Sequence, residues 1–146
     1  MFKTCSRCGK IHDINYICYK NRNYRKNTEA DKFRKTYKWQ SKAEEIKERD
    51  KHLCRVCIAN IYNTTDVYNY KKLEVHHIDK LDINFDKRLE DDNLITLCCY
   101  HHKLADTGLI SKPILILLTD ENCNFKEVRE LVNVKNTPPV LSDNKL

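Results

Sequence analysis

The chain has 146 residues, of which 40% are hydrophobic and 33% are charged, with only 2 Gly and 3 Pro. This composition is typical of one compact α-containing domain with a short appendage, and it excludes a fibrous or largely disordered chain. The longest apolar run, Ile114 to Leu118, has the length of a strand or core helix and is far too short to span a membrane. The first ten residues lack the apolar stretch of a secretory signal, so we expect a cytoplasmic protein without a membrane partner.

Basic residues are concentrated in the first part of the chain. Residues 1–60 hold 16 Lys and Arg against 7 Asp and Glu, whereas residues 61–146 hold 11 against 14. This asymmetry indicates a polyanion-binding part beside a cation-binding centre, and a merely solvated charged surface is the alternative. The 8 cysteines should stay reduced in the cytoplasm, so their spacing indicates metal ligands rather than disulfides.

The N-terminal segment, residues 1–18, carries four potential metal ligands and is too short to bury a core of its own. A zinc ion could replace the missing core. We therefore predict a zinc knuckle here, with exposed thiols on a mobile arm as the alternative. The four ligands of this second zinc are Cys5, Cys8, His12 and Cys18.

Residues 19–36 hold seven basic and two acidic residues, with aromatic residues between them. We predict a basic linker in which Lys and Arg follow nucleic-acid phosphates while the rings stack on bases. An ordinary solvated linker is the alternative. The basic residues are Lys20, Arg22, Arg25, Lys26, Lys32, Arg34 and Lys35, and the aromatic residues are Tyr19, Tyr24 and Phe33.

The middle of the chain predicts a helix followed by two strands. Trp39, Ala43 and Ile46 recur at helical spacing between residues 37 and 50. The segments LEVHHI (73–78) and NLITLC (93–98) are short and apolar, as strands are. The polar segment between them contains six acids and a short helical stretch, FDKRLEDD.

The last third of the chain predicts two further helices and a tail. One helix begins at HHKLAD (101–106). The other is a closing helix, and a Pro-containing polar tail from residue 135 is expected to be flexible. The apolar residues that define the closing helix are Phe125, Val128, Leu131 and Val132.

Two ligand pairs, each with two residues between its members, predict a closed zinc site. Cys54 and Cys57 form the first pair, and 40 residues later Cys98 and His101 form the second. This spacing lets a tight turn aim two ligands at one tetrahedral ion. Because all four positions are filled by protein, the zinc would be structural and would contribute on the order of 10 kcal/mol to folding. Buried core cysteines are the alternative, and Cys99 fits the spacing less well than Cys98.

The residues between and beside these pairs resemble the motif of HNH endonucleases. The matching stretches are LEVHHI (73–78), DDNLITLC (91–98) and the His pair at 101–102. The upstream segment WQSKAEEIKERDKHLCRVC (39–57) is also similar to the lead-in helix of phage and prophage members. The resemblance covers over half of the chain. It implies an α+β fold, with a ββα-metal (His-Me finger) nuclease domain at residues 37–134 and its core at residues 50–106.

The resemblance assigns a role to each of four residues. His77 would be the general base, since a neutral imidazole can accept a proton at cellular pH. His76, on the opposite side of the same strand, and His102 would bind the catalytic divalent cation. Asn93 would hold the loop between the strands. Many family members have Asp where this chain has His76, which leaves Mg²⁺, Mn²⁺ or Ni²⁺ open as the working cation.

Two assignments stay open. Asp106, one helical turn after His102, is either a third ligand of the cation or an ordinary solvated acid. His101 and His102 could exchange roles, although the spacing from Cys98 favours His101 as the zinc ligand.

The resemblance implies a metal-dependent DNA endonuclease that hydrolyses phosphodiester bonds, nicking or cutting duplex DNA to leave 5′-phosphate and 3′-hydroxyl ends. Its phage members suggest a role in genome packaging beside a phage terminase, in a bacterium or a phage-infected host; restriction and homing are alternatives. From a different class, the alternative is a non-catalytic zinc-finger DNA-binding protein. RNA also stays open as a substrate.

Overall fold

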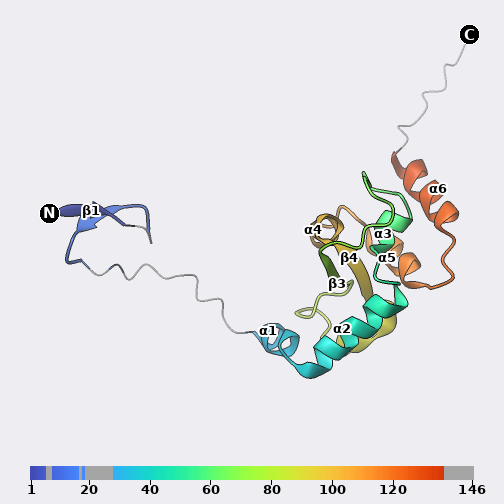
Figure 1. The fold of residues 1–146 in the computed structure, drawn as a ribbon, viewed down its shortest axis with the longest axis horizontal. Helices are drawn as coiled ribbons and strands as arrows, with labels where there is room; N and C mark the ends of the chain where they lie inside the picture. The colour runs from blue at the N-terminus through green and yellow to red at the C-terminus, as the bar shows by residue number, and fades with distance from the viewer. Residues whose placement is uncertain (6–7, 17, 19–27, 137–146) are drawn as a thin grey trace, which may run out of the picture.

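The computed structural model describes residues 1–5, 8–16, 18 and 28–136, with side chains as far as Asn133. In this part the protein is α+β, with helices and two small antiparallel sheets (Figure 1). The tail was predicted from residue 135, but residues 135 and 136 still belong to the last helix, and the rest of the tail lies outside the described residues. No helix in the described ranges is both long and apolar enough to cross a membrane.

The N-terminal segment forms a small hairpin. Strand β1 (Phe2–Thr4) pairs with strand β2 (Ile11–Asp13) in antiparallel register. The turn between them closes through backbone hydrogen bonds from Cys5 N to Lys10 O and from Gly9 N to Cys5 O, both 2.8 Å. Gly9 has a φ of 72°, a left-handed conformation that favours glycine. A hairpin this short has few side chains to bury, which agrees with the need for a metal.

Helix α1 (Glu29–Arg34) corrects one prediction, because residues 28–36 are not a linker. Thr28 caps the helix: its hydroxyl accepts the Asp31 N–H at 3.2 Å, and the Asp31 carboxylate accepts the Thr28 N–H at 3.3 Å. Ala30 and Phe33 are buried in a small core around Leu81. Phe33 therefore packs inside the protein and is not free to stack on a base.

Helix α2 (Tyr37–Arg49) confirms the predicted amphipathic helix. It begins at Thr36, whose hydroxyl accepts the Trp39 N–H at 3.2 Å, and Ile46 is its fully buried residue. After α2 the chain turns sharply, since Lys51 and His52 both have positive φ, and then enters helix α3 (Arg55–Ile58).

The two predicted strands are confirmed and form a hairpin. Strand β3 (Leu73–His77) pairs antiparallel with strand β4 (Leu94–Cys98), so that Leu73 lies opposite Cys98 and His77 opposite Leu94. Two short 3-10 helices, η1 (Asp86–Leu89) and η2 (Asp91–Asn93), occupy the connection. Every residue of β4 is buried, because α2, α3, α4 and α5 all contact this strand (Figure 1).

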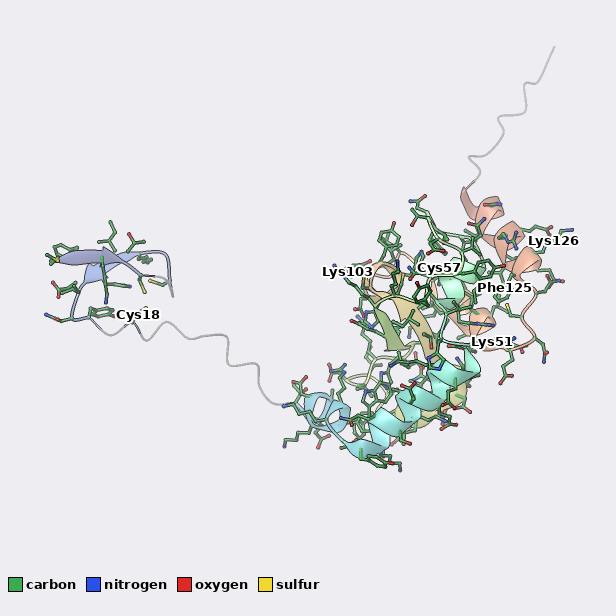
Figure 2. All side chains as sticks on the ribbon, viewed as in Figure 1. Cys18, Lys51, Cys57, Lys103, Phe125 and Lys126 are labelled. Carbon is green, nitrogen blue, oxygen red and sulfur yellow. The ribbon has the colours of Figure 1, made fainter. Side chains whose placement is uncertain are left out.

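Three helices complete the fold: α4 (Cys99–Asp106), α5 (Lys112–Thr119) and α6 (Phe125–Asn136). Helix α4 begins two residues before the predicted start. The apolar run at 114–118 lies in α5. Phe125 begins α6 beside α3, with the Arg55 guanidinium 4.9 Å from the centre of its ring (Figure 2). The largest fully buried side chains of the main core include Val56, Ile95, Leu97, Ile110, Leu115 and Leu118.

Asp50 joins α2 to the sheet and is only 1% exposed. Its carboxylate accepts the Thr96 N–H of β4 at 2.8 Å and two hydrogen bonds from Arg49, at 2.9 and 3.1 Å. Arg49 in turn donates to the Leu94 carbonyl at 2.8 Å. A buried carboxylate is stable only when its oxygens are paired in this way, so this network fixes α2 against β4.

Candidate metal centres and active-site cleft

The two predicted zinc pairs converge in the folded chain. Cys54 precedes α3 and Cys57 lies within it, while Cys98 ends β4 and His101 lies in the first turns of α4. The four side chains are between 0% and 3% exposed. The Sγ atoms of Cys54, Cys57 and Cys98 lie 3.5, 3.3 and 3.3 Å from His101 Nδ1, and Cys57 Sγ lies 4.0 Å from Cys98 Sγ.

These distances suit zinc. Around a tetrahedral zinc ion, sulfur atoms lie about 3.8 Å apart and sulfur lies about 3.5 Å from nitrogen, given Zn–S near 2.3 Å and Zn–N near 2.0 Å. His101 Nε2 lies 3.3 Å from the Tyr62 carbonyl, to which it can donate its proton, so that Nδ1 keeps a lone pair for the metal. This cluster could hold a zinc ion.

The thiols show why a cation is needed there. A hydrogen bond from Cys57 lowers the pKa of Cys54 to about 4, and the same contact, together with burial, raises the pKa of Cys57. Burial also raises the pKa of Cys98. Without a metal, the cluster therefore favours one thiolate, Cys54, beside two protonated thiols, whereas a zinc ion would stabilise all three thiolates.

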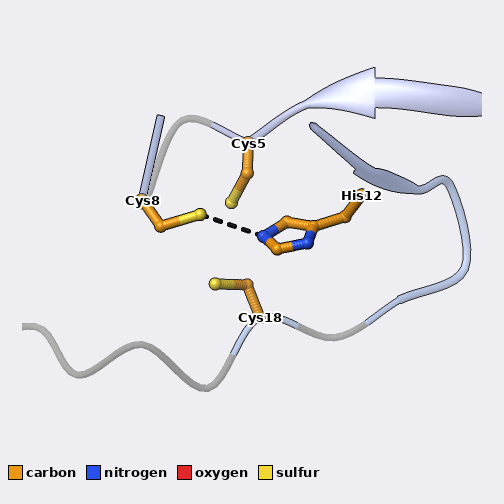
Figure 3. A group of neighbouring side chains, drawn as sticks. All are labelled: Cys5, Cys8, His12 and Cys18. Atoms are coloured by element: carbon orange, nitrogen blue, oxygen red, sulfur yellow. Dashed lines mark hydrogen bonds between the residues drawn. The ribbon is translucent and has the colours of Figure 1, made fainter. Parts of the chain in front are cut away.

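The N-terminal cluster converges as well. Figure 3 shows the side chains of Cys5, Cys8, His12 and Cys18 pointing toward one another from the hairpin and the segment after it. Cys8 Sγ lies 2.9 Å from His12 Nε2 and accepts the Lys10 N–H at 3.4 Å. This cluster could also hold a zinc ion, but its cysteines are only half-buried, unlike those of the main body.

A third group lies where β3 meets α4. The rings of His76 and His102 are 4.8 Å apart and nearly perpendicular. The Asp106 carboxylate approaches both, with Oδ1 3.7 Å from His76 Nδ1 and Oδ2 3.2 Å from His102 Nδ1. Burial lowers the pKa of His76 to about 4, so its imidazole is neutral and can donate a lone pair. The three residues could hold a metal ion, and the acid that the sequence left open is among them.

His77, the next residue of β3, faces the opposite side. Its ring stacks on Trp39 of α2, with centres 4.5 Å apart and planes inclined by 26°. His77 Nε2 lies 3.2 Å from the Arg88 carbonyl, which fixes the proton on Nε2 and leaves a lone pair on Nδ1. Burial lowers the pKa of His77 to about 4, so the ring is neutral at neutral pH.

Asn93 joins the two ends of the loop between β3 and β4. Its Oδ1 accepts the Asp79 N–H at 2.6 Å, and its Nδ2 donates to the Lys87 carbonyl at 3.0 Å. The side chain is buried, so both bonds lie out of competition with water. These contacts hold the loop between the two strands in place.

One cleft of about 520 Å³ contains both histidines of β3, together with His102 and Asp106. Trp39, Arg34 and Lys47 also line it. The position of Trp39 beside His77 was not predictable, because the helical spacing of Trp39 indicated only a buried face. Of the other basic residues predicted to bind nucleic acid, Lys32 and Lys35 do not line this cleft. The rest lie outside the described residues: Lys20, Arg22, Arg25 and Lys26.

Comparison with protein-family models, with curated proteins and with solved structures found no match for this chain.

Proposed function

We propose that this chain is an HNH-type, metal-dependent DNA endonuclease. The observation that carries the proposal is that two neighbouring histidines of β3 have different surroundings. His76 belongs to a group of potential cation ligands. Within the described part of the chain His77 belongs to no such group, and it keeps a neutral imidazole with one nitrogen held by a carbonyl. Both line the same cleft. A structural zinc site needs no such second histidine, but a hydrolytic site does.

In the proposed reaction, His77 Nδ1 takes a proton from a water molecule as its oxygen attacks the phosphorus. The P–O3′ bond breaks, and the leaving 3′ oxygen takes up a proton from solvent, giving 5′-phosphate and 3′-hydroxyl ends. His76, His102 and Asp106 would hold a divalent cation, which would supply Lewis acidity to polarise the phosphate and to offset charge on the leaving oxygen. Trp39 and the Arg88 carbonyl hold the His77 ring in place.

The donor set bears on the choice of cation. Two imidazoles and one carboxylate suit Mn²⁺ or Ni²⁺ better than Mg²⁺, which prefers oxygen ligands. We therefore expect the highest activity with Mn²⁺ or Ni²⁺ and lower activity with Mg²⁺.

DNA is the proposed substrate because basic side chains line the cleft and a bound divalent cation would make its net charge positive. Arg34, Lys47 and Lys80 line it together with the acids Glu74, Asp82 and Asp106, and the cation would more than offset the Asp106 carboxylate. Such contacts fix a phosphate backbone without reading its sequence. The half-exposed N-terminal zinc hairpin would add a second contact to the same DNA.

The test is conversion of supercoiled plasmid by the full chain across Mg²⁺, Mn²⁺, Ni²⁺ and Zn²⁺. His77→Asn should abolish cleavage while leaving DNA affinity intact. His52→Asn is the matched control, since His52 is half-exposed and lies outside the cleft, and its positive φ is tolerated by Asn. If the wild-type chain cleaves no DNA with any of these cations but still binds it, a non-catalytic zinc-finger DNA-binding protein replaces the nuclease.

A further inference from the structure

A second hollow of about 310 Å³ adjoins the cation group on the side of α5. It shares His76, Lys80 and Asp106 with the active-site cleft, so the two hollows meet at the cation group. Ser111 and Lys112, at the start of α5, line only the second hollow. We call it the α5 hollow.

The α5 hollow has a surplus of positive charge. Lys112 Nζ pairs with Asp79 Oδ1 at 2.6 Å, and Lys87 Nζ lies 4.0 Å from the other oxygen of the same carboxylate. Lys80 Nζ donates to the Asp106 carbonyl, a neutral acceptor, at 3.3 Å. Around the hollow, the ammonium groups of Lys80, Lys112 and Lys87 stand against two carboxylates, those of Asp79 and of Asp106, which lines it. One positive charge remains, and a cation bound at Asp106 would add to it, so the hollow should attract an anion.

Its lining combines a charged rim with an apolar floor. Lys112 is 57% exposed at the rim. Ile110 and Leu115 are almost fully buried beneath it, and Ile83 is exposed at the side. The volume of the hollow is at the lower end of the range for ligand pockets, because such pockets are rarely smaller than about 300 Å³. Such a lining suits a nucleotide whose phosphate meets the ammonium groups while its sugar lies on the apolar side chains.

We propose that the α5 hollow binds the nucleotide next to the scissile phosphate, on the same DNA strand. The inference rests on the proposed nuclease function and adds a substrate subsite to it. A strand carries one phosphate for about every 3.4 Å of duplex axis, so a strand crossing the cation group brings a neighbouring phosphate to an adjoining hollow. Lys80 and Lys112 would then decide which phosphodiester lies at the cation group, without reading a base.

The first experiment tests the phosphate site without any cleavage. Thymidine 5′-monophosphate is titrated into ¹⁵N-labelled full chain with its zinc retained and no other divalent cation. The amides of Gly108, Ser111 and Lys112 should shift in the wild type and should not shift in the Lys80→Gln/Lys112→Gln variant.

Lys103→Gln is the matched control for this titration. Lys103 lies on α4, next to the cation ligand His102, but lines neither hollow (Figure 2). The control should shift like the wild type. Absence of shifts in the wild type, or equal shifts in the double variant, would overturn the subsite.

The second experiment locates the subsite on DNA. Duplexes carry a single neutral methylphosphonate at each of the three phosphates on either side of the cut. In the wild type, one of these substitutions should lower kcat/KM roughly threefold to tenfold, as expected for one lost phosphate contact. In the Lys80→Gln/Lys112→Gln variant the same substitution should have no further effect, because the contact is already absent.

An undiminished methylphosphonate effect in the double variant would contradict the subsite even if the enzyme is active. If the wild type cuts no DNA, the nuclease proposal is wrong. The nucleotide titration then still decides whether the α5 hollow binds phosphate.

Discussion

At the scale of single residues, the surroundings of His77 decide what its imidazole can do. The Trp39 ring covers one face, the Arg88 carbonyl takes one nitrogen, and burial keeps the ring neutral. Each contact comes from a different part of the chain, so the ring is held from several sides. An imidazole held in this way needs little reorganisation free energy when it accepts a proton.

Replacing Trp39 should therefore act through His77. We expect Trp39→Leu to lower kcat roughly tenfold to a hundredfold with little change in KM, because the base loses its stacking partner and its orientation. Trp39→Phe should restore much of the rate, since it keeps an aromatic face. Steady-state cleavage of a defined duplex measures both constants. Tyr37→Leu, on an exposed residue of the same helix, is the control; if it lowered kcat as much as Trp39→Leu, the stacking argument would be wrong.

His101 and His102 are neighbours in sequence but belong to different metal groups. If the buried cluster holds zinc as proposed, His101→Ala removes one of its ligands and should unfold the domain, since structural zinc contributes on the order of 10 kcal/mol. His102→Ala should leave a folded, zinc-containing chain without nuclease activity. Circular dichroism, zinc content and plasmid cleavage together separate the two. A folded His101→Ala chain with its full zinc content would show that the assignments are exchanged.

At the scale of elements, the sequence predicts those parts whose pattern is local. The ligand pairs around Cys54 and Cys98 were predictable because two-residue spacing is itself the geometry of a knuckle. Helix α2 and the hairpin β3–β4 carry enough apolar residues to show their period.

Helix α1 and the role of Asp106 needed tertiary information. With six residues, α1 is too short to show a period, and only contact with Leu81 and Trp39 reveals that Phe33 is a core residue. A Thr28–Asp31 capping box was the available signal, hidden in a run of basic residues. Helical spacing predicted that Asp106 lies near His102. It could not predict that His76 of β3 faces both residues.

The attachment of α2 to β4 depends on one buried carboxylate. Asp50→Ala would leave Arg49 without its charge partner and the Thr96 N–H without its acceptor. We expect the free energy of unfolding to fall by about 3 kcal/mol, as for other broken buried ion pairs. Urea denaturation measures the change. Asp92→Asn, on an exposed carboxylate, should change it little; equal losses in both variants would contradict the role given to Asp50.

At the scale of the whole molecule, the two Cys/His clusters that could hold zinc differ in burial. The cysteines of the main-body cluster are almost fully buried, whereas those of the N-terminal hairpin are half-buried. A chelator can reach the hairpin directly, but it reaches the main cluster only when the domain opens. The two ions should therefore leave the protein by different routes.

We expect a chromogenic chelator to release zinc in two phases. The fast phase, from the N-terminal hairpin, should leave the main body folded, weaken DNA binding and preserve cleavage at saturating DNA. The slow phase, from the main cluster, should coincide with unfolding measured by circular dichroism. Cys8→Ser should abolish the fast phase alone. A single phase, or one zinc per chain, would remove the N-terminal site.

Cys98 of β4 lies opposite Leu73 of β3. Further along β3, His76 and His77 face opposite sides of the hairpin. A slip of one residue in this pairing would turn each side chain to the other face. Depending on its direction, the slip would bring either His77 to the cation group or His76 to Trp39. By anchoring Cys98, the structural zinc would prevent this register slip. It would therefore keep His77 as the base and His76 as the ligand, in addition to stabilising the fold.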